Sequence, residues 1–378
     1  SVLTHGFALS TCDWEPIFGL FYLYCFYSAR LLLIFYYFRV KNLIFLYTLK
    51  DMVNLLPIAS GKGGVGKSSF AVNLAVTLAQ KEKSVVLADL DFGGANLHTL
   101  LGLKNNHAGL GNFIYKQTND FSSLLQETGV PNLKFVAGDC LFPGTANMDY
   151  SAKRRITKAL NAQEADYVIM DLGAGTTYNT LDFFLLTYNS IIVTTSELTS
   201  ILNAYSFLKA AAFRFFMRQF KAKSEERIFI NEFLAKSATG TEASFIDLVN
   251  KLAKKFKESG KKAKSELLKY RPQVVINMGQ NSSDLEMAKR LRALVQNKLG
   301  ITIDFVGFLQ KDEQVSYSVA LRKPLALANP QCKFVSGVNT AADRIMLHSY
   351  GYNDLNMFEN EDTDSDIDLA ILEKEFET

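Results

Sequence analysis

The sequence predicts an α/β protein of three layers, in which a mostly parallel central sheet is flanked by helices on both faces. From residue 52 onward, short apolar runs alternate with helical patterns, as in parallel β-α-β units. The runs show little polar alternation, which is typical of strands buried on both faces. The predicted strands span residues 55–59, 85–89, 133–137, 167–171, 190–194, 273–277 and 303–309.

A glycine-rich loop joins the first predicted strand to a helical pattern over residues 70–75. The loop reads Gly61-Lys62-Gly63-Gly64-Val65-Gly66-Lys67-Ser68 and matches the pattern G-x-x-x-x-G-K-[ST]. Backbone N–H groups of such a loop surround phosphates, Lys67 reaches the β and γ oxygens, and the Ser68 hydroxyl takes a Mg²⁺ position. The sequence therefore predicts nucleotide binding on a three-layer P-loop NTPase fold. A simple loop of this kind does not need a second lysine at Lys62.

Two further strand ends carry acids suited to phosphate chemistry. Asp89-Leu90-Asp91 follows one strand, and a carboxylate there can hold Mg²⁺ or orient an attacking water. Val168-Ile169-Met170-Asp171 is a Walker-B pattern, whose acid binds Mg²⁺, usually through water. Gly173-Ala174-Gly175 then allows backbone amides to approach a γ-phosphate. Because phosphate sites lie at the carboxyl ends of parallel strands, we expect these segments to converge on one site.

Composition limits the classes of function. The chain has 378 residues, of which 48% are hydrophobic, enough for one large domain or two small ones. A net charge of +3 indicates no global attraction to nucleic acid or membrane, so such binding requires a local patch. The cysteines are scattered without a C-x-x-C pair, which argues against a zinc site, a redox motif or a disulfide framework and favours the cytoplasm. They are Cys12, Cys25, Cys140 and Cys332.

Residues 1–51 lack an initiator Met and are dense in Phe, Tyr, Leu and Ile. One interpretation is a hydrophobic leader or membrane anchor, because the apolar run over residues 17–38 approaches the length that a bilayer needs. Arg30 in the middle of that run is costly in lipid. The favoured interpretation is a non-native upstream segment read in frame, since Met52 opens the first strand. The predicted fold therefore begins at Met52.

Two later segments depart from the strand–helix alternation. Residues 214–271 are rich in lysine, and Val249, Leu252, Ala253 and Phe256 recur at helical spacing, which predicts a helical insertion. Its lysines form either a solvated face or a surface for nucleic acid, anionic lipid or an acidic partner. The acidic tail, residues 351–378, is expected to be disordered, with a short acidic helix over residues 367–376. Its negative charge argues against docking on anionic lipid.

The three motifs together resemble one known family. The segments K-G-G-x-G-K-S, D-L-D-F-G-G-A-N-L-H and D-L-G-A-G resemble the MinD/ParA family of deviant Walker-A ATPases. The resemblance covers Met52 to about His348 and is interrupted by the lysine-rich insertion, which implies one ATPase domain over residues 52–350. Within the family, residues 95–98 and 173–176 are most similar to the flagellar-number regulators FlhG/FleN.

The chain also differs from that family at several places. It reads Ser196-Glu197-Leu198 where relatives often read Pro-Glu-Pro, and it has Gln310 where they often have proline. The acidic tail stands where MinD has a basic amphipathic helix that targets membranes, and no such basic helix is seen.

The resemblance implies a role for each matching residue. Lys62 would be the signature lysine, which crosses a dimer interface to phosphates bound by the other subunit. Lys67 would bind the β- and γ-phosphates, and Asp91 would position the hydrolytic water. Asp89 would support the Mg²⁺ shell, and Asp171 would be a second-sphere metal carboxylate. The implied catalytic set is Lys62, Lys67 and Asp91; the nucleotide-binding set is Gly61, Gly63, Gly64, Val65, Gly66, Lys67, Ser68, Ser69, Gly173, Asn277, Gln310 and Asp312; the metal set is Ser68, Asp89 and Asp171; and the cofactors are ATP and Mg²⁺.

Two functions fit this resemblance. The first is a slow regulatory ATPase whose ATP-dependent homodimer recruits a protein partner and controls cell division or the placement or number of flagella or other cell-surface structures. The second is a ParA-like partitioning ATPase that binds nonspecific DNA, for which the lysine-rich insertion could supply the surface. Either protein would be cytoplasmic, or peripheral to the membrane or nucleoid.

Two other classes of protein are disfavoured by the sequence. Metal-cluster assembly scaffolds with related P-loops use paired cysteines near a dimer interface, which Cys140 and Cys332 do not provide. A metabolic kinase is disfavoured because Lys62 serves dimer switching and no second-substrate motif stands out.

Overall fold

The computed structural model describes residues 53–138, 148, 150–237 and 244–351. These residues belong to one unit of the chain, which begins at Val53. The predictions for residues 1–51, for the acidic residues 352–378 and for Cys12, Cys25 and Cys140 lie outside the described residues.

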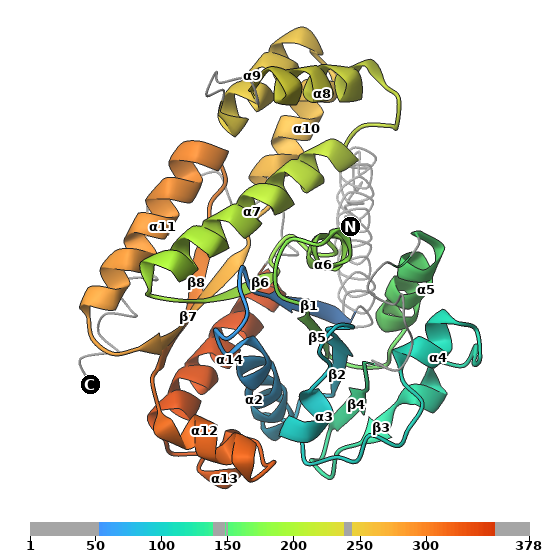
Figure 1. Ribbon diagram of the computed structural model, residues 1–378, viewed down its shortest axis with the longest axis vertical. Coiled ribbons are helices and arrows are strands. Elements are labelled where there is room, and N and C mark those ends of the chain that lie inside the picture. The colour runs from blue at the N-terminus through green and yellow to red at the C-terminus, as the bar shows by residue number, and fades with distance from the viewer. Residues whose placement is uncertain (1–52, 139–147, 149, 238–243, 352–378) are drawn as a thin grey trace, which may run out of the picture. The chain divides into compact units, whose positions relative to one another are not determined.

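The described residues form an eight-stranded sheet of order β3-β4-β2-β5-β1-β6-β7-β8 (Figure 1). The strands are β1 (Asn54–Ala59), β2 (Val85–Leu90), β3 (Gln126–Glu127), β4 (Leu133–Val136), β5 (Tyr167–Leu172), β6 (Ile191–Thr195), β7 (Gln273–Gly279) and β8 (Asp304–Gln310). All pairs are parallel except β3 with β4. All seven predicted strands are present, with ends within two residues of the prediction. The antiparallel edge strand β3 was not predicted because two residues show no periodicity.

Helices cover both faces of the sheet. On one face lie α2 (Lys67–Gln80) and α14 (Lys333–Gly351), and on the other lie α6 (Tyr178–Phe184), α7 (Leu198–Arg218) and α11 (Ser283–Leu299) (Figure 1). Successive side chains of β1 enter different cores: those of Leu56 and Ile58 pack in the α2 and α14 core, and that of Leu55 in the α7 core. The three-layer α/β prediction is confirmed.

Shorter elements complete the described fold. They are α3 (Leu97–Leu100), α4 (Leu110–Ile114), η1 (Ser122–Leu124), α5 (Tyr150–Asn161), α12 (Glu313–Ala320) and α13 (Leu325–Ala328). Among the described residues, no helix combines the length and the apolar character that crossing a bilayer requires.

The described part of the lysine-rich segment is largely helical, as predicted. Helices α8 (Glu225–Ser237), α9 (Phe245–Lys255) and α10 (Ser259–Leu268) lie between α7 and β7. Helix α9 begins at a capping box, in which the Ser244 hydroxyl accepts a hydrogen bond from the Asp247 N–H at 3.1 Å and the Asp247 carboxylate accepts one from the Ser244 N–H at 3.1 Å. Val249 and Leu252 are buried, in agreement with their spacing. Residue 214, the predicted start of the insertion, lies within α7.

One buried carboxylate joins three helices on the α7 face. Asp182 of α6 pairs with Lys153 of α5 and with Arg214 and Arg218 of α7, and it is 7% exposed. Because removing a partner from a buried ion pair is costly, this cluster fixes α5 and α6 against α7.

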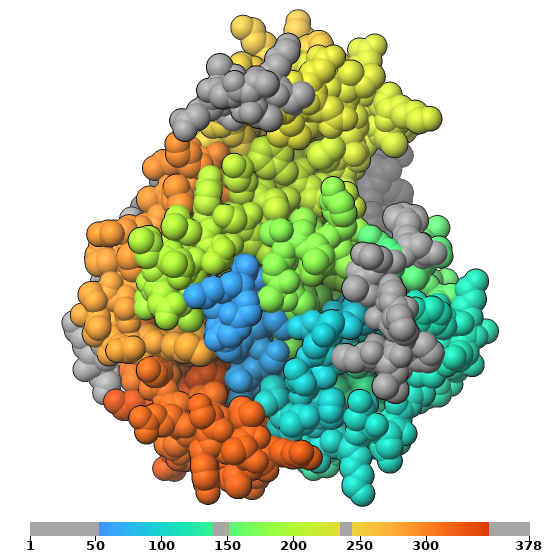
Figure 2. All heavy atoms as spheres, in the orientation of Figure 1, coloured from blue at the N-terminus to red at the C-terminus, as the bar shows by residue number. Residues whose placement is uncertain are grey.

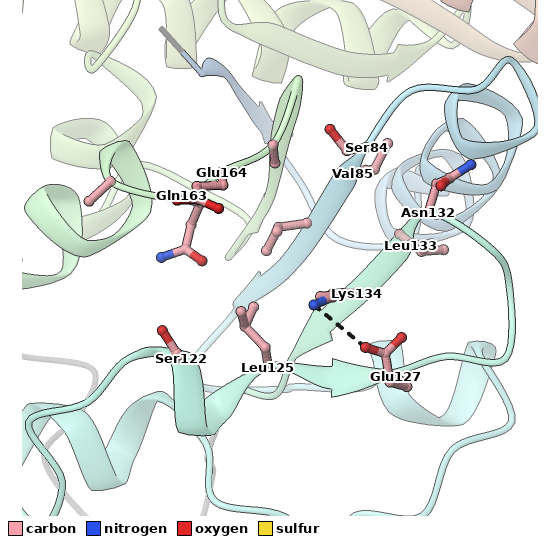
Figure 3. A pocket seen from close by; sticks show the side chains of 13 residues that line it. Ser84, Val85, Ser122, Leu125, Glu127, Asn132, Leu133, Lys134, Gln163 and Glu164 are labelled. Atoms are coloured by element: carbon pink, nitrogen blue, oxygen red, sulfur yellow. Dashed lines mark ion pairs between the residues drawn. The ribbon is translucent and has the colours of Figure 1, made fainter. Parts of the chain in front are cut away.

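A pocket of about 700 Å³ opens at the amino-terminal ends of strands β2 and β4 (Figure 3). Glu127 of β3 and Lys134 of β4 form an ion pair of 3.5 Å there. The lining residues are Ser84, Val85, Val86, Ser122, Leu125, Glu127, Asn132, Leu133, Lys134, Ala162, Gln163, Glu164 and Ala165. This lining includes none of the predicted nucleotide-site residues, which lie at the carboxyl ends of the strands.

Candidate functional site

The order of the strands brings the predicted phosphate loop and both predicted acidic strand ends together. β1 lies beside β5, and β5 lies beside β2. Asp171 pairs in register with Ile58 of β1 and with Asp89 of β2, so the two carboxylates lie on neighbouring strands at the same level. The three segments therefore converge at one edge of the sheet.

The glycines of the phosphate loop fall into two kinds. Gly64 and Gly66 have φ angles of 80° and 83°, in the left-handed region that favours glycine. A Cβ at Gly66 would lie 2.2 Å from Nδ2 of Asn277, and one at Gly61 would lie 2.3 Å from the Asn203 carbonyl oxygen of α7. A Cβ at Gly63 or Gly64 would meet nothing within 4 Å. The loop is thus packed tightly at Gly61 and Gly66 and open between them, which leaves backbone accessible to a phosphate group.

Lys67 and Ser68 form a triangle with Asp171, in which Lys67 and Asp171 are buried. The Lys67 ammonium donates to Oδ1 of Asp171 at 2.6 Å, and the Ser68 hydroxyl donates to Oδ2 at 2.7 Å. Lys67 is 6% exposed and Asp171 is 1% exposed. Burial raises the pKa of Asp171, and the Lys67 ammonium opposes that rise. A hydroxyl and a carboxylate are oxygen ligands of the kind Mg²⁺ takes, and an ammonium is the matching ligand for a phosphate. The residues fit a Mg²⁺-nucleotide.

Asp89 lies beside this triangle and is also buried. Its Oδ1 accepts a hydrogen bond from the Asp91 N–H at 3.1 Å, and its Oδ2 accepts one from the Leu97 N–H at 3.2 Å. Burial, and after it the charge of Asp171, raises the pKa of Asp89 to about 7. Two acids that disfavour each other's ionisation are a suitable environment for a divalent cation, which would relieve that repulsion.

Asp91 lies where the loops after β2 and β5 meet. A Cβ at Gly173 would be 3.3 Å from Oδ1 of Asp91, so the carboxylate lies close over that glycine. The Gly175 N–H donates to the Ser60 carbonyl at 3.0 Å, which joins the loop after β5 to the start of the phosphate loop. Asp91 is partly exposed, unlike Asp89, and is therefore accessible to a water molecule.

The Lys62 side chain contacts the start of α7. Its ammonium donates to Oε2 of Glu197 at 3.0 Å and lies 3.5 Å from the Thr199 hydroxyl. Both residues are at the start of α7, which borders the blue phosphate loop in Figure 2. The Lys62 side chain is 32% exposed, whereas that of Lys67 is 7% exposed. Glu197 and Thr199 were not predicted as partners of Lys62, because only the order of the strands shows that β6, and hence α7, lies beside β1.

The residues predicted to line an adenine pocket lie at the ends of β7 and β8. Asn277 donates from Nδ2 to the Val65 carbonyl at 2.8 Å, so it supports the phosphate loop directly. Gln310 ends β8 and pairs with Gly279. Asp312 caps α12 by accepting a hydrogen bond from the Gln314 N–H at 2.9 Å. The structure brings Asn277 to the loop and leaves Gln310 and Asp312 on the neighbouring strand end.

Ser69 directly follows the phosphate loop in the chain. It lies in the first turn of α2, and its carbonyl oxygen accepts a hydrogen bond from Nδ2 of Asn73 at 2.8 Å. The same Asn73 accepts from the Ala326 N–H at 2.8 Å, which links α2 to α13.

A parallel sheet with a glycine loop after its central strand, a buried lysine–aspartate pair and acids on the neighbouring strand ends defines a P-loop NTPase. Residues 51–214 match the ParA family model, described as "NUBPL iron-transfer P-loop NTPase". These matched residues, less than half of the chain, are similar to the ParA/MinD family of P-loop NTPases, as the motifs predict.

Several relatives are about one third identical to this chain over the residues that align. The septum site-determining protein MinD of Helicobacter pylori is 32% identical over 153 residues, which cover 40% of this chain and 56% of that protein. The flagellum site-determining protein YlxH of the same species is 30% identical over 187 residues, covering 45% and 58%. The iron-sulfur cluster carrier protein of Synechocystis is 33% identical over 164 residues, covering 41% and 45%. The chain thus spans about half the length of these relatives.

Solved structures support the fold over a longer stretch. The cell division ATPase MinD of Pyrococcus furiosus has a TM-score of 0.54 and 16% identity, over 78% of this chain and 99% of that one. MinD of Pyrococcus horikoshii, solved with Mg-ADP, has a TM-score of 0.53 and 16% identity, over 78% and 96%.

The relatives do not separate the expected functional classes. The septum, flagellum and iron-sulfur proteins match with similar identity. Of the two cysteines considered for a cluster scaffold, Cys332 is buried and free, and Cys140 is outside the described residues. The exclusion of cluster scaffolds therefore stays a prediction that depends on the missing cysteine pairs.

Proposed function

We propose that this chain is a slow regulatory ATPase that works as an ATP-dependent dimerisation switch. The observation that supports this most strongly is the division of work between two lysines. Lys67 is buried against Asp171 inside the loop, whereas Lys62 leaves the loop and forms an exposed ion pair. A lysine whose ammonium contacts α7 through an exposed ion pair is available for phosphates bound by another subunit.

Each residue of the site has a stated role in this proposal. ATP with Mg²⁺ supplies the γ-phosphoryl group that is transferred to water, and its hydrolysis gives ADP and phosphate. The loop N–H groups and Lys67 would hold the phosphates, while Ser68, Asp89 and Asp171 would hold the metal. Asp91 orients the water and accepts its proton.

Lys62 would exchange its partner when two chains associate. Two nucleotides that face each other carry strong negative charge, and a Lys62 ammonium from each chain offsets the repulsion. Dimerisation then reports the presence of a γ-phosphate, and hydrolysis dissolves the dimer.

Asp91→Ala tests the switch, because the variant is expected to bind ATP and dimerise but not to hydrolyse. For the parent chain, ATPase activity per subunit should rise with protein concentration, and the dimer should decay as ATP is consumed. For Asp91→Ala, light scattering should show a dimer that persists. Asp343→Ala, a change of an exposed acid that pairs with Lys81, serves as the control. Hydrolysis by Asp91→Ala at the parent rate would remove Asp91 from the mechanism.

We infer that the partner acts in placing flagella or the division site, because matched relatives are named as septum and flagellum site-determining proteins. The switch would act in the cytoplasm, or at the periphery of the membrane or nucleoid. The genes beside this one test the assignment: flagellar export genes support flagellar placement, and partition genes support the second candidate.

A ParA-like partitioning ATPase is the second candidate, because helices α9 and α10 present many exposed lysines. In that case an ATP-bound dimer binds DNA nonspecifically, and binding falls steeply with salt. Binding that survives high salt or does not depend on ATP would rule this candidate out.

A further inference from the structure

Helices α9 and α10 carry a dense positive surface. The apolar side chains of α9, such as Phe245 and Leu248, are buried in the α7 core, so its lysines face outward. We call the exposed lysines of this region the lysine surface: Lys251, Lys254, Lys255, Lys257, Lys261, Lys262, Lys264 and Lys269. Helices α8 to α10 gather in the yellow region of Figure 2, away from the blue phosphate loop.

The charge of the lysine surface is poorly neutralised by its surroundings. Residues 251–269 contain eight lysines and two acids, a net charge of +6, whereas the whole chain carries only +3. Among the described residues, one direct ion pair involves these lysines, between Lys269 and Glu266 at 2.9 Å. Lys264 donates to the neutral amide of Asn250, and Lys255 lies over the ring of Phe229. A surface with this excess of positive charge attracts a polyanion.

The same chain contains a segment of opposite charge. Residues 352–378 contain ten acidic side chains and one lysine, a net charge of −9. This segment directly follows α14 and provides carboxylates enough to face every lysine of the surface.

Helix α14 ends on the side of the sheet where strands begin, which is also where α10 ends. Gly337 lies against the backbone of Phe308 near the end of β8, and Ala341 lies against Gly307, so α14 runs toward the edge where strands begin. Asp343 pairs there with Lys81, just beyond the end of α2. Helix α10 ends at the same edge, where the chain enters β7. Twenty-seven residues span up to about 90 Å when extended, so the segment can reach from one helix end to the other.

Chemistry also favours a carboxylate-rich occupant. The lysine surface contains no arginine, so it offers hydrated point charges rather than the planar forks that bind phosphate in two places. Each exposed pair is weak and screened by salt. Tethering raises the effective concentration of the segment to roughly millimolar, which allows many weak pairs to act together.

We propose that the acidic segment, residues 352–378, docks on the lysine surface of its own chain and shields that surface from external polyanions. The contact is electrostatic, intramolecular and salt-sensitive. It does not depend on the proposed ATPase cycle.

Carbodiimide cross-linking of the full chain locates the segment. Cross-links between its acids and the lysine surface should dominate at about 50 mM salt and fall at least about fivefold at about 500 mM. Changing Lys254, Lys257, Lys261 and Lys262 to Gln should also lower cross-linking of the segment to Lys251, Lys255, Lys264 and Lys269, which keep their amines, because the docking charge is reduced. The matched control changes four exposed lysines elsewhere, Lys104, Lys116, Lys158 and Lys298, to Gln and should leave the pattern unchanged.

Competition tests the shielding. A chain ending at Gly351 should bind a DNA duplex of about 30 base pairs at least about tenfold more tightly than the full chain at about 100 mM salt. A synthetic peptide of residues 352–378 should reverse that gain, and a peptide with every Asp and Glu replaced by Asn and Gln should not.

Three results would overturn the proposal. Cross-links from the segment mainly to lysines outside the surface would contradict the docking site. Cross-links mainly between isotopically distinct chains would contradict the intramolecular contact. Equal duplex binding by the full and shortened chains, or weak binding by both, would contradict shielding.

Discussion

Two lysine–acid pairs begin on the same phosphate loop, and their surroundings differ. Lys67 and Asp171 are 2.6 Å apart, with side chains 7% and 2% exposed. Lys62 and Glu197 are 3.0 Å apart, with side chains 32% and 69% exposed. Removing one member of a buried pair leaves a bare charge and costs about 3–5 kcal/mol, whereas an exposed pair contributes about 0–1 kcal/mol. The buried pair is therefore a fixed part of the site, and the exposed pair can exchange its partner at little cost.

Asp171→Ala should cause the largest loss, because it leaves the Lys67 ammonium buried without its carboxylate. We expect the free energy of unfolding of the nucleotide-free protein to fall by about 3–5 kcal/mol, as measured by urea denaturation. Combining Asp171→Leu with Lys67→Met, which removes both charges, should restore most of that loss. If Asp171→Ala and Glu197→Ala destabilised the protein equally, the contrast between the two pairs would be wrong.

Asp89, which lies beside the buried Lys67–Asp171 pair, should make the free energy of unfolding depend on pH. Its folded pKa of about 7 is above the ordinary value of 3.8, so the folded protein holds the proton more tightly than the unfolded chain. Stability is therefore lost as pH rises from about 4 through about 7, by an amount on the order of 4 kcal/mol. Asp89→Asn should lack this loss.

The measurement is denaturation of metal-free protein in chelator across that pH range, with Asp343→Asn as an exposed control. Asp171, whose pKa is also raised, contributes with the same sign to every protein in the series. The test compares the slopes of the free energy of unfolding against pH. The offsets between the curves are not compared, because the Asp89→Asn change alters the hydrogen bonds at all pH values. Parallel curves for the parent and Asp89→Asn would contradict the assigned pKa.

Glu197→Gln should have the smallest effect. Because the pair is exposed, the free energy of unfolding should change by less than about 1 kcal/mol. Dimerisation with Mg²⁺-ATP should strengthen by up to about fivefold, since Lys62 no longer has a competing carboxylate. Sedimentation analysis measures this; a weaker dimer would instead assign Glu197 a place in the interface.

The sequence predicted the layers of the fold and the strands of the site, because both depend on local patterns. Leu56 and Ile58 alternate with Leu55 along β1, and glycines and acids mark the strand ends. It did not predict β3, which is too short to show a period.

Contacts between segments that are distant in the chain could not be predicted from the sequence. That Glu197 holds Lys62 and that Asn277 holds the Val65 carbonyl depends on which strands are neighbours in the sheet. The close approach of Asn203 to Gly61 has the same origin. The residues of the site were found from motifs, and their partners required the strand order.

The central claim is that Lys62 acts on another subunit and Lys67 on its own. Light scattering of Lys62→Ala and Lys67→Ala with Mg²⁺-ATP, combined with titration calorimetry of ATP binding, tests it directly. We predict that Lys62→Ala binds ATP within about threefold of the parent affinity yet stays monomeric, while Lys67→Ala loses about 100-fold or more in ATP affinity. A stable ATP-dependent dimer of Lys62→Ala, or equal loss of ATP affinity in both variants, would contradict the account.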